Sequence, residues 1–85
     1  MYYVYVIYSK ALDNFYLGYS EDLRRRIESH KSGRSKYTSQ TRDWILVYYE
    51  AYASEKLARL REAKLKRANR MRSLLYERLR EELSE

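Results

Sequence analysis

The chain has 85 residues, with 18 Lys and Arg against 12 Asp and Glu, a formal net charge of +6, and neither cysteine nor proline. This length favours one domain with a thin core, and the lack of cysteine with only one histidine excludes disulfides, thiolate metal sites and multi-histidine zinc sites. No apolar run approaches the roughly 20 residues that span a bilayer, and the first residues lack a basic leader, so we expect a cytoplasmic protein without a membrane segment.

The first residues predict a β-hairpin. Residues 2–8 are aromatic and β-branched throughout, which is typical of a buried strand. Residues 11–14 favour a turn, and residues 15–19 give a second strand.

A helix is predicted after the hairpin. We expect Ser20 to cap it, with Glu21 and Asp22 in its first turn, and Gly33 to end it. The stripe predicted to face inward has the spacing i, i+4 and i+7 and consists of Leu23, Ile27 and His30.

The second half predicts a loop, a strand and two helices. Residues 31–43 are polar and basic, and residues 44–50 favour a third strand. Ser54 is the expected cap of a helix over residues 55–67, and another helix is expected over residues 71–82.

Apolar stripes predict which faces of these two helices are buried. The residues expected to face inward are Leu57, Ala58, Leu60 and Leu65 on the first, and Met71, Leu74, Leu75 and Leu79 on the second. Arg61 falls inside the first stripe, where only a snorkelling side chain is expected, and Asn69 is a candidate interruption between the helices.

The order β-β-α-β-α-α predicts a single α+β domain over residues 1–85, an α/β sandwich with three antiparallel strands and three flanking helices. The first two strands are too close together for a crossover helix, which argues against a fully parallel sheet.

The net positive charge has two interpretations that composition does not separate. It keeps a small protein soluble, and it attracts phosphates, whose counterions are released on binding. Hydrolysis of a phosphodiester further needs charge neutralisation at phosphorus, an activated water and a scissile bond held in line.

Two charged side chains are candidates for that chemistry. Arg26 carries a guanidinium, which stays charged and grips phosphate oxygens in a fork; the alternative is a surface arginine in the basic run 24–26. Glu62 is the candidate ligand for Mg²⁺, which often takes one or two protein carboxylates and completes its shell with water and substrate phosphate. The alternative is a solvated glutamate paired with Lys66 at i+4.

Tyr5 and Tyr16 lie in the middle of the two hairpin strands, and their odd spacing leaves open whether they share a face. A phenol beside a cation can lose its proton more easily than its usual pKa of about 10 suggests, so either is a candidate general base, with sheet packing as the alternative. His30, one turn after Arg26, either relays a proton or caps the helix. Gly18 either makes a tight turn or leaves room for a phosphate near the helix amides.

In this order, the residues resemble the GIY-YIG endonuclease superfamily, which is named for two tripeptides on adjacent strands. Residues 3–5 (Tyr-Val-Tyr) stand for the first tripeptide and residues 16–18 (Tyr-Leu-Gly) for the second. The steps of eleven residues between their tyrosines and of ten residues to Arg26 are similar to those of the family. Residues 44–50 followed by residues 61–66 resemble its stand-alone bacterial members.

The resemblance covers about residues 2–75. It implies a divalent metal, Mg²⁺ or Mn²⁺, on Glu62, phosphate contact from Arg26, and one of the two hairpin tyrosines near the attacking water. His30 occupies a position where the family carries a histidine or tyrosine. The predicted catalytic residues are therefore Tyr5, Tyr16, Arg26, His30 and Glu62.

The chain departs from the family pattern in three places. Tyr3 and Val4 replace the first glycine and the isoleucine, and Tyr19 stands where some relatives have lysine. Glu77 stands where several active relatives have a late asparagine, and Asn69 would substitute for it only if one helix continues through both positions.

The sequence thus favours a divalent-metal-dependent endonuclease that hydrolyses DNA phosphodiester bonds in repair or recombination, on branched or damaged DNA and with a protein partner for targeting. The loop residues expected to grip the DNA backbone are Arg34, Lys36, Thr38 and Arg42. A non-catalytic nucleic-acid-binding module that retains the nuclease fold is the alternative, and a protein-interaction domain is a third hypothesis. Oligomeric state and the choice between DNA and RNA are not fixed by the sequence.

Overall fold

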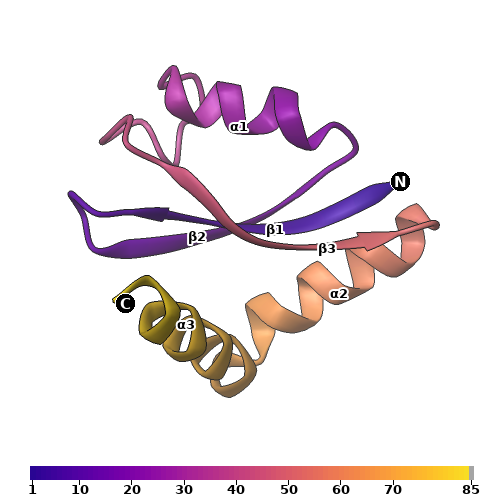
Figure 1. The fold of residues 1–85 in the computed structure, drawn as a ribbon. Coiled ribbons are helices and arrows are strands. Elements are labelled where there is room, and N and C mark those ends of the chain that lie inside the picture. Colours follow the sequence, from indigo (N-terminus) through magenta and orange to yellow (C-terminus); the bar gives the residue numbers. More distant parts are fainter. Residues whose placement is uncertain (85) are drawn as a thin grey trace.

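The protein, in a computed structural model that describes residues 1–84, has the predicted α+β architecture, with a three-stranded sheet between helical layers (Figure 1). The elements follow the order β1 (Tyr2–Ser9), β2 (Asn14–Ser20), α1 (Leu23–Lys31), β3 (Ile45–Tyr52), α2 (Glu55–Arg67) and α3 (Asn69–Leu83). None of the helices described in residues 1–84 is both long and apolar enough to cross a membrane.

The sheet has the strand order β2-β1-β3, and both pairs are antiparallel. Tyr5 pairs with Gly18 on one side and with Tyr49 on the other, while Ile7 pairs with Tyr16. Directly paired residues point to the same face, and so do residues two apart on a strand. Tyr5 and Tyr16 therefore share a face, which the sequence had left open.

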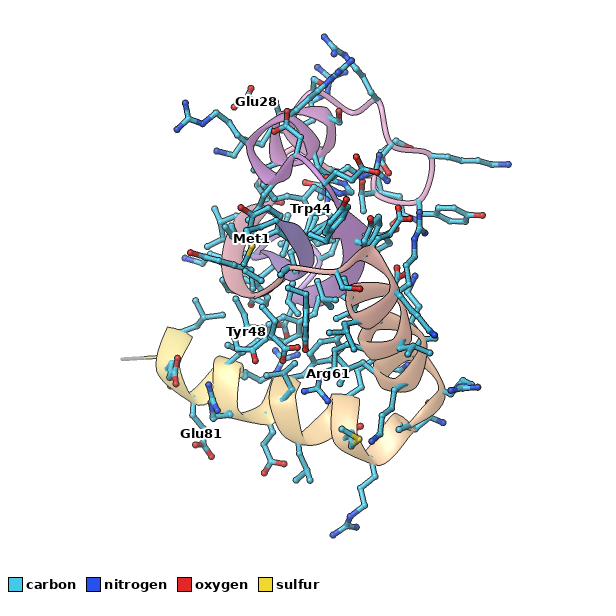
Figure 2. The ribbon with its side chains drawn as sticks, turned by 90° about the vertical axis from the view of Figure 1, so that its right-hand side faces the viewer. Met1, Glu28, Trp44, Tyr48, Arg61 and Glu81 are labelled. Atoms are coloured by element: carbon cyan, nitrogen blue, oxygen red, sulfur yellow. The ribbon has the colours of Figure 1, made fainter. Side chains whose placement is uncertain are left out.

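The helices cover both faces of the sheet, with α1 on one side and α2 and α3 on the other (Figure 1). The α1-side core is formed by Tyr5, Ile7 and Trp44, with the partly buried side chains of Tyr16, Leu23 and Ile27. The core under α2 and α3 is formed by Val4, Val6, Phe15, Leu17, Ala58, Leu65 and Leu79. Figure 2 shows Trp44 on the α1 side and Tyr48 with Arg61 on the other. Since β1 lies between the two layers, it is apolar on both faces.

The start of α1 differs from the prediction. Asp22, not Ser20, caps the helix, and its carboxylate accepts a hydrogen bond from the Arg25 amide at 3.2 Å. Ser20 still pairs with Tyr3 as the last residue of β2, so the helix begins two residues later than a Ser20 cap would give, without acidic residues in its first turn. The predicted end is confirmed, because Gly33 follows the last turn with a φ of 75°, which favours glycine.

The predicted cap of α2 is confirmed, but half of its predicted stripe is wrong. The Ser54 hydroxyl accepts from the Leu57 amide at 3.3 Å. Leu57 and Leu60 are exposed, whereas Ala58 and Leu65 are buried. The face of α2 that carries Ala58 and Leu65 therefore packs on the sheet, and the face that carries Leu57 and Leu60 points to solvent.

Three smaller points concern the second half of the chain. Strand β3 covers Ile45–Tyr52, so Trp44 precedes it. Leu74 on α3 is exposed, and Tyr76 takes a place in the core instead. Ala68 has ψ of 82° and separates α2 from α3, so Asn69 does not continue the helix that carries Glu62.

Candidate active site

Tyr5 is the centre of a polar cluster between β1 and α1. Its side chain is 0% exposed, and its hydroxyl lies 2.7 Å from Nε2 of His30. Nε of Arg26 donates to the same oxygen at 3.3 Å. Two residues of α1, one turn apart, thus meet one phenol of the sheet.

Gly18 makes room for this phenol. A Cβ atom at Gly18 would lie 2.4 Å from the Tyr5 hydroxyl oxygen and 2.5 Å from Cζ, far inside van der Waals contact. The two sequence interpretations of Gly18, a tight turn or a space for phosphate, are both wrong, because it lies within β2 and its space is filled by Tyr5.

Tyr16 completes the α1-side cluster. Its ring centroid lies 5.3 Å from that of His30. The pKa of Arg26 is raised chiefly by its hydrogen bond to Tyr5, with a smaller contribution from Tyr16. Tyr5, Tyr16, Arg26 and His30 are therefore brought together, on one face, from three elements.

Burial decides the protonation of the two innermost groups. Burial raises the pKa of Tyr5 to about 12, and the lowering effect of Arg26 is smaller. Arg26 alone therefore does not make this phenol ionise easily, because loss of solvent penalises the phenolate. Burial, and then the charge of Arg26, lower the pKa of His30 to about 4, so the imidazole is neutral near pH 7.

The second nitrogen of His30 is held by the loop between α1 and β3. Nδ1 lies 2.6 Å from the hydroxyl oxygen of Thr38, whose side chain is 1% exposed. Trp44 Nε1 donates to the Thr38 carbonyl at 2.9 Å. Thr38 was expected to contact DNA, but its hydroxyl is buried against His30 and is not available to a phosphate. The other loop residues in that expectation, Arg34, Lys36 and Arg42, are exposed.

Glu62 comes from α2, on the other side of the sheet from α1 (Figure 1). Its side chain is 17% exposed and forms an ion pair with Lys66 at 3.2 Å, as the simpler interpretation of its spacing predicted. Arg59, one turn earlier, stacks on Tyr19 with its guanidinium carbon 3.9 Å from the ring centroid, which holds this part of α2 against β2. Burial is the main cause that raises the pKa of Tyr5, and the Glu62 carboxylate is the last of the smaller contributors. Among the described residues, Glu62 thus makes no hydrogen bond or ion pair with Tyr5, Tyr16, Arg26 or His30, and its one ion pair is with Lys66.

These residues fit a loosely held metal ion better than an enclosed one. Within residues 1–84, no group of three or more His, Cys, Asp or Glu side chains is placed to hold a metal. Glu62 supplies one carboxylate, which suits Mg²⁺ only if water and substrate phosphate supply the remaining ligands.

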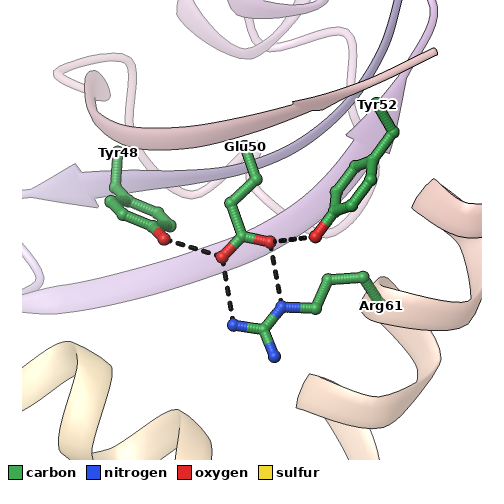
Figure 3. Close-up of polar contacts among 4 residues, drawn as sticks. All are labelled: Tyr48, Glu50, Tyr52 and Arg61. Carbon is green, nitrogen blue, oxygen red and sulfur yellow. Dashed lines mark hydrogen bonds and ion pairs between the residues drawn. The ribbon is translucent and has the colours of Figure 1, made fainter.

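Another polar cluster, which the sequence analysis did not identify, fixes α2 on β3 (Figure 3). Glu50 accepts from Arg61 Nε at 2.9 Å and Nη2 at 3.0 Å, and from the hydroxyls of Tyr48 at 2.6 Å and Tyr52 at 2.7 Å. Burial alone would raise the pKa of Glu50, but these hydrogen bonds outweigh it and hold the pKa at about 2. Arg61, which the sequence places inside the apolar stripe of α2, is thus paired with Glu50 of β3. The sequence does contain a signal for this cluster, because residues 48, 50 and 52 alternate along one strand and so share one face of the sheet.

Comparison with known proteins identifies the family to which the chain belongs. The family model for the GIY-YIG catalytic domain matches residues 1–74. The chain belongs to this family of nuclease domains, as its tripeptides and their spacing predicted.

The chain is similar to several bacterial UPF0213 proteins. It is 38% identical over 74 residues to one from Staphylococcus haemolyticus, covering 85% of this chain and 88% of the relative. It is 39% identical over 69 residues to one from Streptococcus pneumoniae, covering 80% and 69%. A solution NMR structure of a UPF0213 protein from Bacillus halodurans has 34% identity and a TM-score of 0.56, and the match covers 91% of this chain and 84% of that one.

Proposed function

We propose that this protein is a divalent-metal-dependent endonuclease that hydrolyses DNA phosphodiester bonds. The observation that carries the proposal is the hydrogen-bonded cluster of Tyr5, Arg26 and His30, placed on one sheet face beside Tyr16. A cluster of this composition, in a chain of net charge +6, suits a phosphate ester.

Burial divides the candidate residues into two groups. Tyr5 and His30 are 0% exposed, so they position their neighbours without touching substrate. Tyr16, Arg26 and Glu62 are half-buried and reach the surface. The catalytic contacts are therefore assigned to these three, and Tyr5 and His30 are positioning residues.

Arg26 binds the scissile phosphate. Its Nε–H is fixed by Tyr5, and the rest of its rigid guanidinium fork is left to grip phosphate oxygens. Its permanent charge stabilises the negative charge that develops on phosphorus oxygens in the transition state. Held by a buried phenol, the guanidinium needs little rearrangement during the reaction.

Tyr16 orients the attacking water and acts as the general base that takes its proton. The water oxygen bonds to phosphorus as the bond to the leaving oxygen breaks, and the leaving oxygen takes a proton from solvent water. Glu62 would hold Mg²⁺ or Mn²⁺, which supplies Lewis-acid stabilisation of the phosphate when bound. Nucleases of this family generally use divalent metal ions.

The exposed cations Arg34, Lys36 and Arg42 would hold the DNA backbone beside the site. Branched or damaged DNA, formed in repair or recombination in the cytoplasm, is the expected substrate. A domain this small would be directed to it by a protein partner.

The first test is a nicking assay on branched, nicked and single-stranded DNA with Mg²⁺ or Mn²⁺. Glu62→Gln should remove metal-dependent cleavage, and Glu81→Gln, an exposed change on α3, should leave it unchanged. Wild-type activity in Glu62→Gln would show that the metal assignment is wrong.

The two tyrosines separate catalysis from positioning. Tyr16→Phe should lower the cleavage rate by about a hundredfold or more, as expected for loss of a general base. Tyr5→Phe should lower the cleavage rate less, because the phenylalanine ring still packs in the core and the missing hydroxyl only positions Arg26 and His30. Full activity in Tyr16→Phe would overturn its assignment as the base.

A non-catalytic nucleic-acid-binding module is the second candidate. It is favoured by the ion pair between Glu62 and Lys66, which occupies the proposed metal ligand, and by Glu77 in place of the late asparagine. This candidate predicts salt-sensitive binding that EDTA does not change, with no cleavage of any of the three DNA substrates.

A further inference from the structure

Tyr37 places a large aromatic ring almost entirely in solvent. Its side chain is 77% exposed, although a tyrosine ring normally finds apolar cover. It lies in the loop between α1 and β3, which also contains Thr38 and therefore reaches the candidate active site.

The backbone beside this ring is held firmly. The amide of Thr38 donates to the Ser35 carbonyl at 3.2 Å, and its carbonyl accepts from Trp44 Nε1 at 2.9 Å. Its hydroxyl is 2.6 Å from His30 Nδ1. Tyr37 is thus an exposed ring on an anchored support, so little further ordering is needed when a flat ligand binds to it.

The segment that carries Tyr37 is strongly basic in sequence. Residues 31–42 contain no acidic residue and four cations, all exposed, which are Lys31, Arg34, Lys36 and Arg42. The side chain of Arg42 folds back along the loop, with Nε 3.1 Å from the point where a Cβ atom added to Gly33 would lie. Exposed cations and an exposed aromatic ring on the same short segment suit nucleic acid, whose phosphates can meet the cations and whose bases can meet the ring. An apolar protein partner would gain nothing from four cations.

We propose that Tyr37 is a stacking site for an unpaired nucleobase, with the cations of residues 31–42 binding the adjoining phosphates. This inference rests on the proposed function and narrows its substrate to DNA with an unpaired base near the scissile bond. Bases within a continuous duplex are stacked on each other and offer no free face, so a single-stranded segment, a flap or a frayed end is required.

The anchor also connects base binding to the proposed chemistry. Thr38, next to Tyr37, is hydrogen-bonded to His30, and His30 is hydrogen-bonded to the Tyr5 hydroxyl. The same hydroxyl accepts a hydrogen bond from Arg26. A base stacked on Tyr37 therefore docks on the same hydrogen-bonded frame that holds the phosphate-binding guanidinium.

The experiment measures binding of a short single-stranded oligonucleotide that carries 2-aminopurine, in EDTA to prevent cleavage and at about 50 mM salt, where phosphate contacts are strong. Tyr37→Ala should weaken binding by about tenfold and remove the quenching of 2-aminopurine. Tyr37→Trp should retain both. Tyr49→Ala is the matched control, because Tyr49 is 54% exposed but packs against Tyr3 on the sheet, with ring centroids 5.9 Å apart.

Two further ligands separate stacking from charge. An oligonucleotide of abasic sites should bind wild type and Tyr37→Ala equally, and so should a closed circular duplex, which has no ends to fray. The inference is overturned if Tyr37→Ala binds the base-containing strand as wild type does, or if Tyr49→Ala loses as much. If wild type cuts DNA in a Glu62-dependent way while Tyr37→Ala binds normally, only the stacking site fails. If wild type binds no oligonucleotide, both proposals fail.

Discussion

Gly18→Ala should be among the most damaging single-methyl additions in this chain. The added Cβ would lie 2.4 Å from the Tyr5 hydroxyl oxygen, 2.5 Å from Cζ and 2.9 Å from Cε1. Tyr5 is fully buried between β1 and α1, so the ring moves only at the expense of its contacts.

The expected cost follows from three effects. Overpacking of a filled core costs about 1–3 kcal/mol. A displaced phenol also loses its hydrogen bonds to Arg26 and His30, at about 1 kcal/mol each. Alanine recovers about 0.5–1 kcal/mol of backbone entropy relative to glycine in a strand. The net loss of unfolding free energy is about 3 kcal/mol.

Urea unfolding of a double-mutant cycle tests this reasoning. Tyr5→Leu removes all three clashing atoms, so Gly18→Ala should cost less than about 0.5 kcal/mol in that background. Tyr5→Phe keeps the clashing Cζ and Cε1 atoms, so Gly18→Ala should remain costly in that background. An equal cost of Gly18→Ala in wild type and in the Tyr5→Leu background would refute the steric explanation.

Two further predictions concern the buried titratable groups. Burial lowers the pKa of His30 from 6.5 to about 4, so the unfolded chain takes up this proton before the folded protein does as the pH falls. The free energy of unfolding should therefore be unaffected by His30 above about pH 6.5 and should drop by about 3 kcal/mol towards pH 4. The single imidazole gives one NMR titration curve, and a midpoint above pH 6 would contradict this. Glu50→Gln should cost about 2 kcal/mol in urea unfolding, because it leaves the Arg61 guanidinium half-buried without a counter-charge, whereas Glu77→Gln on the surface should cost less than about 0.5 kcal/mol. A Glu50→Gln variant as stable as wild type would show that this ion pair does not stabilise the fold.

Local patterns in the sequence were enough for the order of elements, because each has a strong signal of its own. The aromatic run over residues 2–8 and the cap at Ser54 needed no tertiary information. Ser20 misled the prediction because a serine ending a strand and a serine capping a helix have the same local pattern. Leu57 and Leu60 misled it because apolar spacing does not fix which side of α2 the small Ala58 brings to the sheet.

The candidate site needed long-range information. Whether Tyr5 and Tyr16 share a face depends on strand register, which the hairpin loop sets. The contact between His30 and Thr38 crosses a loop without periodicity, so Thr38 was placed at the surface. The effect of burial on the Tyr5 phenol follows from the layer above it, which no spacing reveals.

The position of Trp44 has a practical consequence. It is the only tryptophan of the chain, it lies in the α1-side core, and its indole N–H is bonded to the Thr38 carbonyl. Its intrinsic fluorescence is therefore a built-in optical probe of the loop that carries Tyr37. Any ligand that shifts this loop should change the emission spectrum, without a label and without turnover.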